Sequence, residues 1–180
     1  MALEQHFELM AKYNQLMNKQ VYSAAEKLDD TQLREDRGAF FGSILGTLNH
    51  LLVGDIIWLK RFAGHPKDYQ SLQYLGTYPK PSALTEILHS DFSELQKARI
   101  KLDDLISEFS LEASEEDYDF ELSFNNVKGQ PFKKQFGFLV QHFYNHQTHH
   151  RGQVTTLLSQ LGIDVGVTDL LALIPDAEGV

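Results

Sequence analysis

Four long stretches of this chain contain no proline and repeat their apolar residues at helical intervals, which constrains the fold more than any other feature. The intervals predict four helices, over about Leu3–Leu28, Ser43–Phe62, Ser82–Ser110 and Phe136–Leu161. In the second stretch the apolar residues cover well over half of the helical wheel, which is typical of a helix buried on most sides. The sequence therefore predicts an all-α fold, a four-helix bundle, in one domain over residues 1–180.

The pattern changes between the third and fourth predicted helices. Phe120, Leu122 and Phe124 alternate with polar residues, and residues 125–129 are typical of a turn. Tyr118–Lys134 is therefore predicted to be a small β-hairpin insertion before the last long helix. It must pack on a larger body, because a single hairpin is only marginally stable.

The connections and ends carry further expectations. Residues 62–82 form a long link for a simple up-and-down bundle and can be a crossover. Ser82 is the expected N-cap of the third helix. The apolar run Leu170–Ile174 is expected to pack across the bundle, and the last four residues are expected to be frayed.

Composition excludes several classes of function. Lys and Arg number 16 against 25 Asp and Glu, a formal net charge of −9, which argues against a nucleic-acid partner. There is no cysteine, so disulfides, thiolate metal ligands and a cysteine nucleophile are excluded. We see no signal peptide and no membrane-length apolar run, and therefore expect a soluble, cytoplasmic protein with no membrane partner.

The eight histidines are unevenly distributed, because four of them fall within nine residues of the fourth predicted helix. On the helical wheel His146 and His150 lie within the apolar stripe of that helix, one turn apart on one face. Burying two imidazoles side by side is unfavourable unless each finds a partner. A divalent metal accepts a lone pair from each ring, so this pair predicts a metal site.

Two ligands hold a metal poorly, so a third is needed. His50, midway along the buried second helix, is the candidate, and Gly46 and Gly54 at i−4 and i+4 leave room for a close helix or for an ion. For His50 alone, a hydrogen-bonded structural histidine is an equally good interpretation. The zinc-protease motif is excluded because Gln147 follows His146, where that motif needs a glutamate base.

The remaining histidines and the polar neighbours receive weaker expectations. His6, His65 and His89 are expected at the surface without a role, and the roles of His142 and His149 on the helix flank stay open. Residues near the ligands in sequence are candidates to hold the ligand rings by accepting their second N–H: Asn49, Asp55, Asn145 and Gln153. Tyr144 and Arg151 fall on the opposite side of the fourth helix.

Two segments resemble a known family. Residues 47–52 (TLNHLL), with Asp55 and Trp58 following, and residues 142–153 (HFYNHQTHHRGQ), with Leu161 and Gly162 closing the helix, are similar to motifs of the DinB/YfiT-like family. The resemblance covers nearly the whole chain, including the hairpin. The His-Arg-Gly-Gln stretch with a histidine four residues upstream is its more specific part.

The resemblance implies a four-helix bundle of the DinB/YfiT type with three metal-binding histidines, His50, His146 and His150. It implies a divalent ion, zinc or nickel, and a homodimer. Some relatives are transferases or isomerases that use a low-molecular-weight thiol.

Three functions follow as hypotheses. The first is a metal-dependent enzyme acting on a small-molecule substrate, with thiol-dependent transfer favoured and hydrolysis second; any thiol must come from outside, and no catalytic base stands out. The second is a metal-binding or stress-response protein without turnover. The third is a scaffold whose histidines only fill the core.

Overall fold

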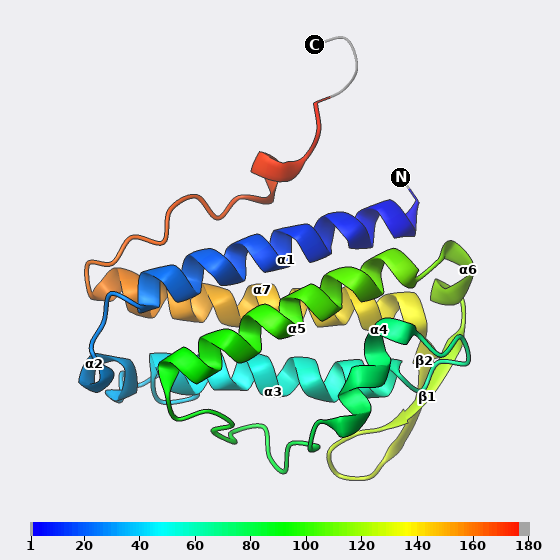
Figure 1. The fold of residues 1–180 in the computed structure, drawn as a ribbon, viewed down its shortest axis with the longest axis horizontal. Helices are drawn as coiled ribbons and strands as arrows, with labels where there is room; N and C mark the ends of the chain where they lie inside the picture. Colours follow the sequence, from blue (N-terminus) through cyan, green and yellow to red (C-terminus); the bar gives the residue numbers. More distant parts are fainter. Residues whose placement is uncertain (1, 177–180) are drawn as a thin grey trace.

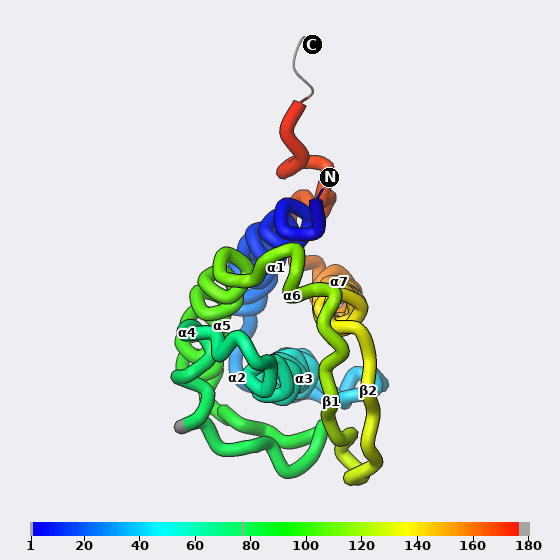
Figure 2. The backbone as a smooth tube through the Cα atoms, turned by 90° about the vertical axis from the view of Figure 1, so that its right-hand side faces the viewer, coloured from blue at the N-terminus to red at the C-terminus, as the bar shows by residue number. Residues whose placement is uncertain are grey.

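The computed structural model describes residues 2–176, and in them four long helices pack around one apolar core. These are α1 (Leu3–Ala25), α3 (Ile44–Phe62), α5 (Phe92–Glu112) and α7 (Phe136–Gln160). Helix α1 packs against α5 and α7, and α3 packs against α7, so that α1 and α3 lie diagonally opposite (Figures 1 and 2). The predicted all-α bundle is confirmed.

Shorter elements connect the long helices. They are α2 (Asp30–Arg34), α4 (Gln70–Gln73), η1 (Tyr74–Thr77), α6 (Glu115–Tyr118), β1 (Glu121–Asn125), β2 (Pro131–Gln135) and η2 (Leu170–Leu173). Strands β1 and β2 are antiparallel, with Phe124 opposite Phe132, and Gly129 takes a positive φ of 78° in the turn. Leu122, only 1% exposed, anchors this hairpin to the core, which confirms the predicted insertion.

The link between α3 and α5 is a crossover that returns along α3 to the other end of the bundle (Figure 1). For this reason α5 begins at Phe92 and is capped by Asp91, which accepts from the Glu94 amide at 2.9 Å. The predicted helix start at Ser82 is wrong. Ser82 donates its N–H and hydroxyl to Glu86, so a local cap-like pattern occurs in a loop that must first cross the molecule.

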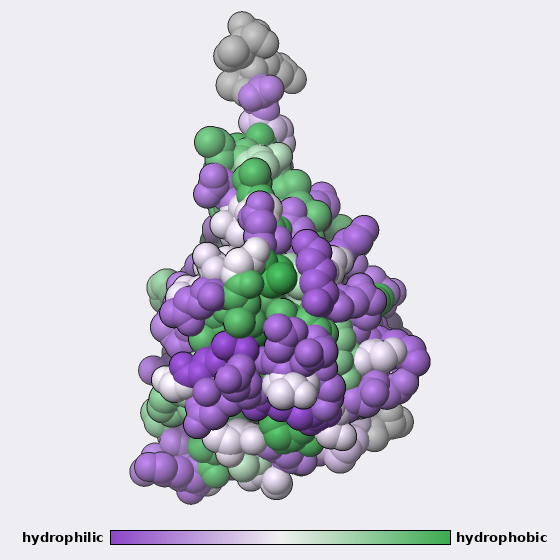
Figure 3. Space-filling model, turned by 90° about the vertical axis from the view of Figure 1, so that its left-hand side faces the viewer, coloured by the Kyte–Doolittle hydropathy of each residue, from purple (hydrophilic) through white to green (hydrophobic). Residues whose placement is uncertain are grey.

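The C-terminal segment does not pack across the bundle, which corrects the expectation for Leu170–Ile174. After α7 the chain runs beside α1, where the Tyr13 hydroxyl donates to the Thr168 carbonyl at 2.7 Å. Helix η2 then buries no residue, and Leu171 is 75% exposed. Figure 3 shows this segment standing clear of the body with hydrophobic residues on its surface. The expectation for the last four residues falls outside the described chain.

Four charged side chains meet in the middle of the bundle. The Arg99 guanidinium pairs with Asp55 at 2.5 Å and with Asp103 at 2.9 Å, and none of these three side chains is more than 5% exposed. Arg151 donates to Asn14 on α1, and Asn18 on α1 donates to Asp103 at 2.8 Å. Two cations and two carboxylates leave the core neutral, and every long helix contributes to this network.

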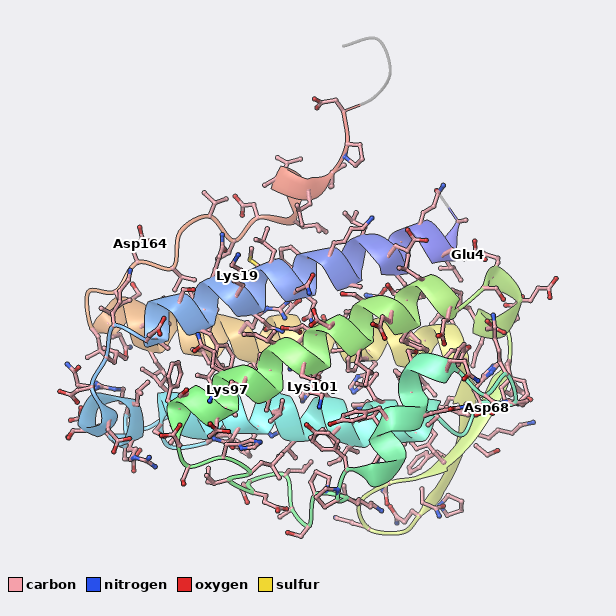
Figure 4. The ribbon with its side chains drawn as sticks, in the orientation of Figure 1. Glu4, Lys19, Asp68, Lys97, Lys101 and Asp164 are labelled. Carbon is pink, nitrogen blue, oxygen red and sulfur yellow. The ribbon has the colours of Figure 1, made fainter. Side chains whose placement is uncertain are left out.

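The outer faces of the helices are charged, as Lys19 on α1 and Lys97 and Lys101 on α5 show in Figure 4. Within residues 2–176, none of the helices has both the length and the apolar character needed to cross a bilayer.

Replacing Arg99 by Met should lower the free energy of unfolding at pH 7 by about 3–5 kcal/mol, because Asp55 and Asp103 then stay buried without a cation. Urea denaturation measures the change. Lys97→Met on the same helix is the control, since its pair with Glu94 is exposed and screened by solvent, so its loss should leave the free energy of unfolding nearly unchanged. Equal losses in the two variants would contradict a special role for the buried network.

Candidate metal centre

Helices α3 and α7 bring three histidines together. His50 Nε2 lies 3.2 Å from His146 Nε2 and 3.2 Å from His150 Nε2. All three ligand atoms lie within 4.8 Å of one another, and in the described part of the chain they form a group that can hold a metal ion. The structure thus places the three sequence-predicted residues at one point, His50 being 4% exposed and the other two partly buried.

In His50 and His150, the hydrogen-bond partner of Nδ1 shows that Nε2 carries the lone pair. His50 Nδ1 lies 2.8 Å from the Leu84 carbonyl oxygen, which can only accept, so this nitrogen carries the proton. His150 Nδ1 likewise donates to Gln153 Oε1 at 2.8 Å. In the neutral rings the two Nε2 atoms therefore point lone pairs at each other over 3.2 Å. Such an arrangement repels itself unless a cation lies between the nitrogens.

The spacing fits a metal. Two imidazole nitrogens bound about 2.1 Å from a tetrahedral zinc lie roughly 3.4 Å apart. His50 Nε2 is already 3.2 Å from the Nε2 atoms of both partners, so these two pairs need little movement. The donor set is three imidazoles without a carboxylate, which suits several divalent transition metals and leaves further coordination positions for water or substrate.

Burial keeps the rings in their neutral, metal-binding form. It lowers the pKa of His50 to about 4 and, together with the neighbouring histidines, lowers the pKa of His146 to about 3. The pKa of His150 is also lowered, mainly by burial. At pH 7 all three nitrogens are therefore available to a metal without first losing a proton.

Glycines on α3 make room for the close approach of the His146 ring and of the segment before the helix. A Cβ added at Gly54 would lie 2.7 Å from His146 Cε1, so only glycine lets this ring approach α3. A Cβ added at Gly46 would lie 2.2 Å from the Phe41 carbonyl oxygen, so this glycine admits the segment before the helix. Space for a close partner helix, predicted from the sequence, is thus confirmed at Gly54.

Two neighbours of the histidines escaped the sequence analysis. The Phe41 ring stacks on His50 with centroids 3.7 Å apart and meets the edge of His150 at 5.5 Å. Leu84 supplies its carbonyl from the crossover. Neither residue carries a sequence signal, because both act from loops whose path over α3 depends on the tertiary fold.

Of the four polar residues predicted to hold the ligand rings, one contacts a ring and three do not. Gln153 does so, through His150. Asn49 instead donates to the Leu45 and His89 carbonyls, and Asp55 pairs with Arg99. Asn145 is exposed. Sequence proximity therefore identified one partner of four.

The remaining histidines lie outside the cluster. His142 meets the edge of Trp58 with ring centroids 5.0 Å apart, and His149 lies 3.4 Å from Gln153. The surface expectation for His65 is wrong, since it is 7% exposed and packs against aromatic rings, including Phe136. Arg151 turns into the core network, away from the three ligands, as the helical wheel predicted.

The stability of the metal-free protein should depend on pH through these rings. The folded pKa of His50 lies below its unfolded value of 6.5, so the unfolded chain binds more protons between about pH 6.5 and 4. Stability is therefore full above about pH 6.5 and falls as the pH drops. Between pH 7 and pH 5, urea unfolding in EDTA should show the wild type losing about 1–2 kcal/mol more than His50→Gln.

The comparison with His50→Gln also removes an opposing effect. Burial raises the pKa of Asp103 to about 6, which favours the folded state as the pH falls, but both proteins share this group. Parallel pH curves for the two proteins would contradict the neutral, buried state of His50.

Gly54→Ala should weaken metal binding at least tenfold, because the new methyl group displaces the His146 ring. Gly152→Ala on α7 is the matched control, since no heavy atom lies within 4 Å of its added Cβ. The control should keep its affinity and gain some helix stability. Competition with a chromophoric chelator measures both affinities, and equal affinities would show that the His146–Gly54 approach is not needed.

Comparisons with known proteins place the sequence in a family. The chain matches the family model described as "DinB family" over residues 3–178. It is also similar to the protein named "Protein DinB" of Bacillus subtilis (strain 168), with 24% identity over 163 residues, covering 88% of this chain and 87% of that protein. No solved structure gave a significant match. Since the family model spans almost the full length of the bundle and all three clustered histidines, this chain belongs to the DinB family.

Proposed function

We propose that this protein is a divalent-metal-dependent enzyme acting on a small molecule, with His50, His146 and His150 as the metal ligands. One observation carries the proposal: neutral imidazoles whose lone pairs converge at 3.2 Å, an arrangement that a bound cation stabilises. Membership of the DinB family and the donor set support it.

We propose zinc or nickel as the ion, since both accept imidazole nitrogen. When bound, the ion supplies a Lewis acid that lowers the pKa of a coordinated water or thiol. The chain's own residues position the site. Leu84 and Gln153 fix the tautomer and direction of two rings, and Phe41 covers the face of His50.

The favoured reaction is transfer of a low-molecular-weight thiol to an electrophilic small molecule, and metal-assisted hydrolysis is second. This preference rests on the resemblance to relatives with such chemistry. Because the chain has no cysteine, the thiol must be a separate substrate. The homodimer expected from the resemblance stays a prediction, for which the exposed apolar residues of the C-terminal segment, such as Leu171, offer a surface.

The alternative is a metal-binding or stress-response protein without turnover. The ligands are the same, so the coordination shell decides between the two. X-ray absorption of the loaded protein that shows three imidazoles and an exchangeable oxygen would favour the enzyme. A shell closed by a fourth protein ligand would favour the alternative.

Elemental analysis of the purified protein should find about one zinc or nickel per chain, and His146→Ala should lose it. His149→Ala is the matched control, an exposed histidine on the same helix that should retain the ion. Wild-type protein that stays metal-free after reconstitution with several divalent ions would overturn the proposal. Loaded protein is then assayed with thiol and electrophile panels, and turnover that disappears in His146→Ala identifies the enzyme.

A further inference from the structure

A hollow of about 660 Å³ lies beside the C-terminal half of α3, between the crossover and the β-hairpin. Figure 2 shows these two segments flanking α3. Three of its lining residues are cationic, Lys60, Arg61 and Lys80, and no Asp or Glu lines it. The chain as a whole carries a net charge of −9, so this hollow gathers positive charge on an otherwise acidic protein.

Arg61 and Lys60 are held in place without carboxylate partners. The Arg61 guanidinium lies 4.4 Å from the Trp58 ring centroid and 5.0 Å from that of Phe124, and no ion pair forms at Arg61 among the described residues. Lys60 donates to the Leu75 carbonyl at 2.6 Å. Partial burial lowers the pKa of both Lys60 and Arg61, and neither shift is opposed by a neighbouring acid. An anion would relieve this uncompensated positive charge.

The hollow and the metal centre lie on the same face of α3. His50, Gly54, Ile57 and Arg61 fall within about 60° of one another on the helical wheel, and Ile57 and Arg61 both line the hollow. With a rise of 1.5 Å per residue, Ile57 lies about 10 Å and Arg61 about 16 Å beyond His50 along the helix.

The crossover and α7 also have residues at both the metal centre and the hollow. On the crossover, Leu84 holds His50, while the preceding residues 80–83 line the hollow. On α7, His142 is one turn from His146 and touches Trp58, on which Arg61 rests.

We propose that this hollow, the anion pocket, binds the carboxylate or phosphate group of an elongated small molecule whose other end reaches the three-histidine centre. The inference rests on the proposed function for the reacting end, while the anion pocket itself can be tested alone. Arg61 offers a planar pair of donors to the oxyanion, and Lys60 and Lys80 add charge. The apolar side chains of Ile57 and Phe124 contact the body of the ligand. The substrate is then an organic anion long enough to extend from Arg61 to the metal centre, two points that lie about 16 Å apart along α3.

The test uses Trp58, the single tryptophan of the chain, as a reporter next to Arg61. Metal-free full-length protein is titrated with 4-phenylbutyrate, with its neutral amide, and with inorganic phosphate, while tryptophan fluorescence and calorimetry are followed. The carboxylate should bind at least tenfold more tightly than the amide, and added salt should weaken the binding. Phosphate that competes with the carboxylate would assign the pocket to oxyanions in general, and phosphate that does not compete would restrict it to carboxylates.

Arg61→Gln should reduce carboxylate affinity about tenfold or more and leave amide binding unchanged. Arg34→Gln on α2, the same exchange at an ion-paired surface arginine, is the control and should bind as the wild type does. Lys80→Gln changes an exposed side chain, so it keeps the fold and should weaken binding severalfold. Equal binding of acid and amide, or unchanged acid affinity in both Arg61→Gln and Lys80→Gln, would overturn the proposal.

Repeating the titration with His146→Ala separates the two hypotheses. Carboxylate binding that survives in this variant supports the anion pocket even if no metal binds anywhere. Metal binding in the wild type without carboxylate binding leaves the proposed metal centre standing and rejects the anion pocket.

Discussion

The buried network of Arg99, Asp55, Asp103 and Arg151 joins the long helices at the centre of the bundle. Two helices that pack through apolar side chains alone can shift by one turn relative to each other. The Arg99–Asp55 ion pair, at 2.5 Å in a dry core, has one favourable arrangement. Because the network takes a partner from each long helix, it fixes the register of all four. We infer that its contribution is mainly to specificity, since removing charges from water costs much of what their attraction returns.

The register set by this network determines where the histidines lie. Asp55 is five residues after His50 on α3, and Arg151 directly follows His150 on α7, so the two helices are aligned immediately beside the cluster. Gly54 then lets the His146 ring reach α3. On α3 and α7 the side that carries Asp55 and Arg151 packs into the core. The opposite side carries the three histidines, whose Nε2 atoms face one another.

The crossover has a second role besides connecting α3 to α5. It carries the Leu84 carbonyl that orients His50, pairs its backbone with Asn49, and forms a wall of the anion pocket. A short loop would supply none of these contacts. The long connection therefore builds the site on a scaffold whose helices supply only the ligands and the floor of the pocket.

The four helices, the hairpin and the pair His146 and His150 could be predicted from the sequence, because periodicity and one-turn spacing are local properties that every chain with this pattern shares. It also indicated His50 and the role of Gly54, though the helical wheel of α3, apolar on nearly all sides, did not show which way His50 points. The start of α5 was misplaced because the cap-like pair Ser82 and Glu86 satisfies the same local rule as a true helix cap. The folded structure was needed to show that Asp55 pairs with Arg99, that His65 is buried, and that Leu84 and Phe41 contact His50. Each of these contacts joins residues that are brought together by the path of a loop or by packing between helices. Neither can be inferred from the local spacing of residues in the sequence.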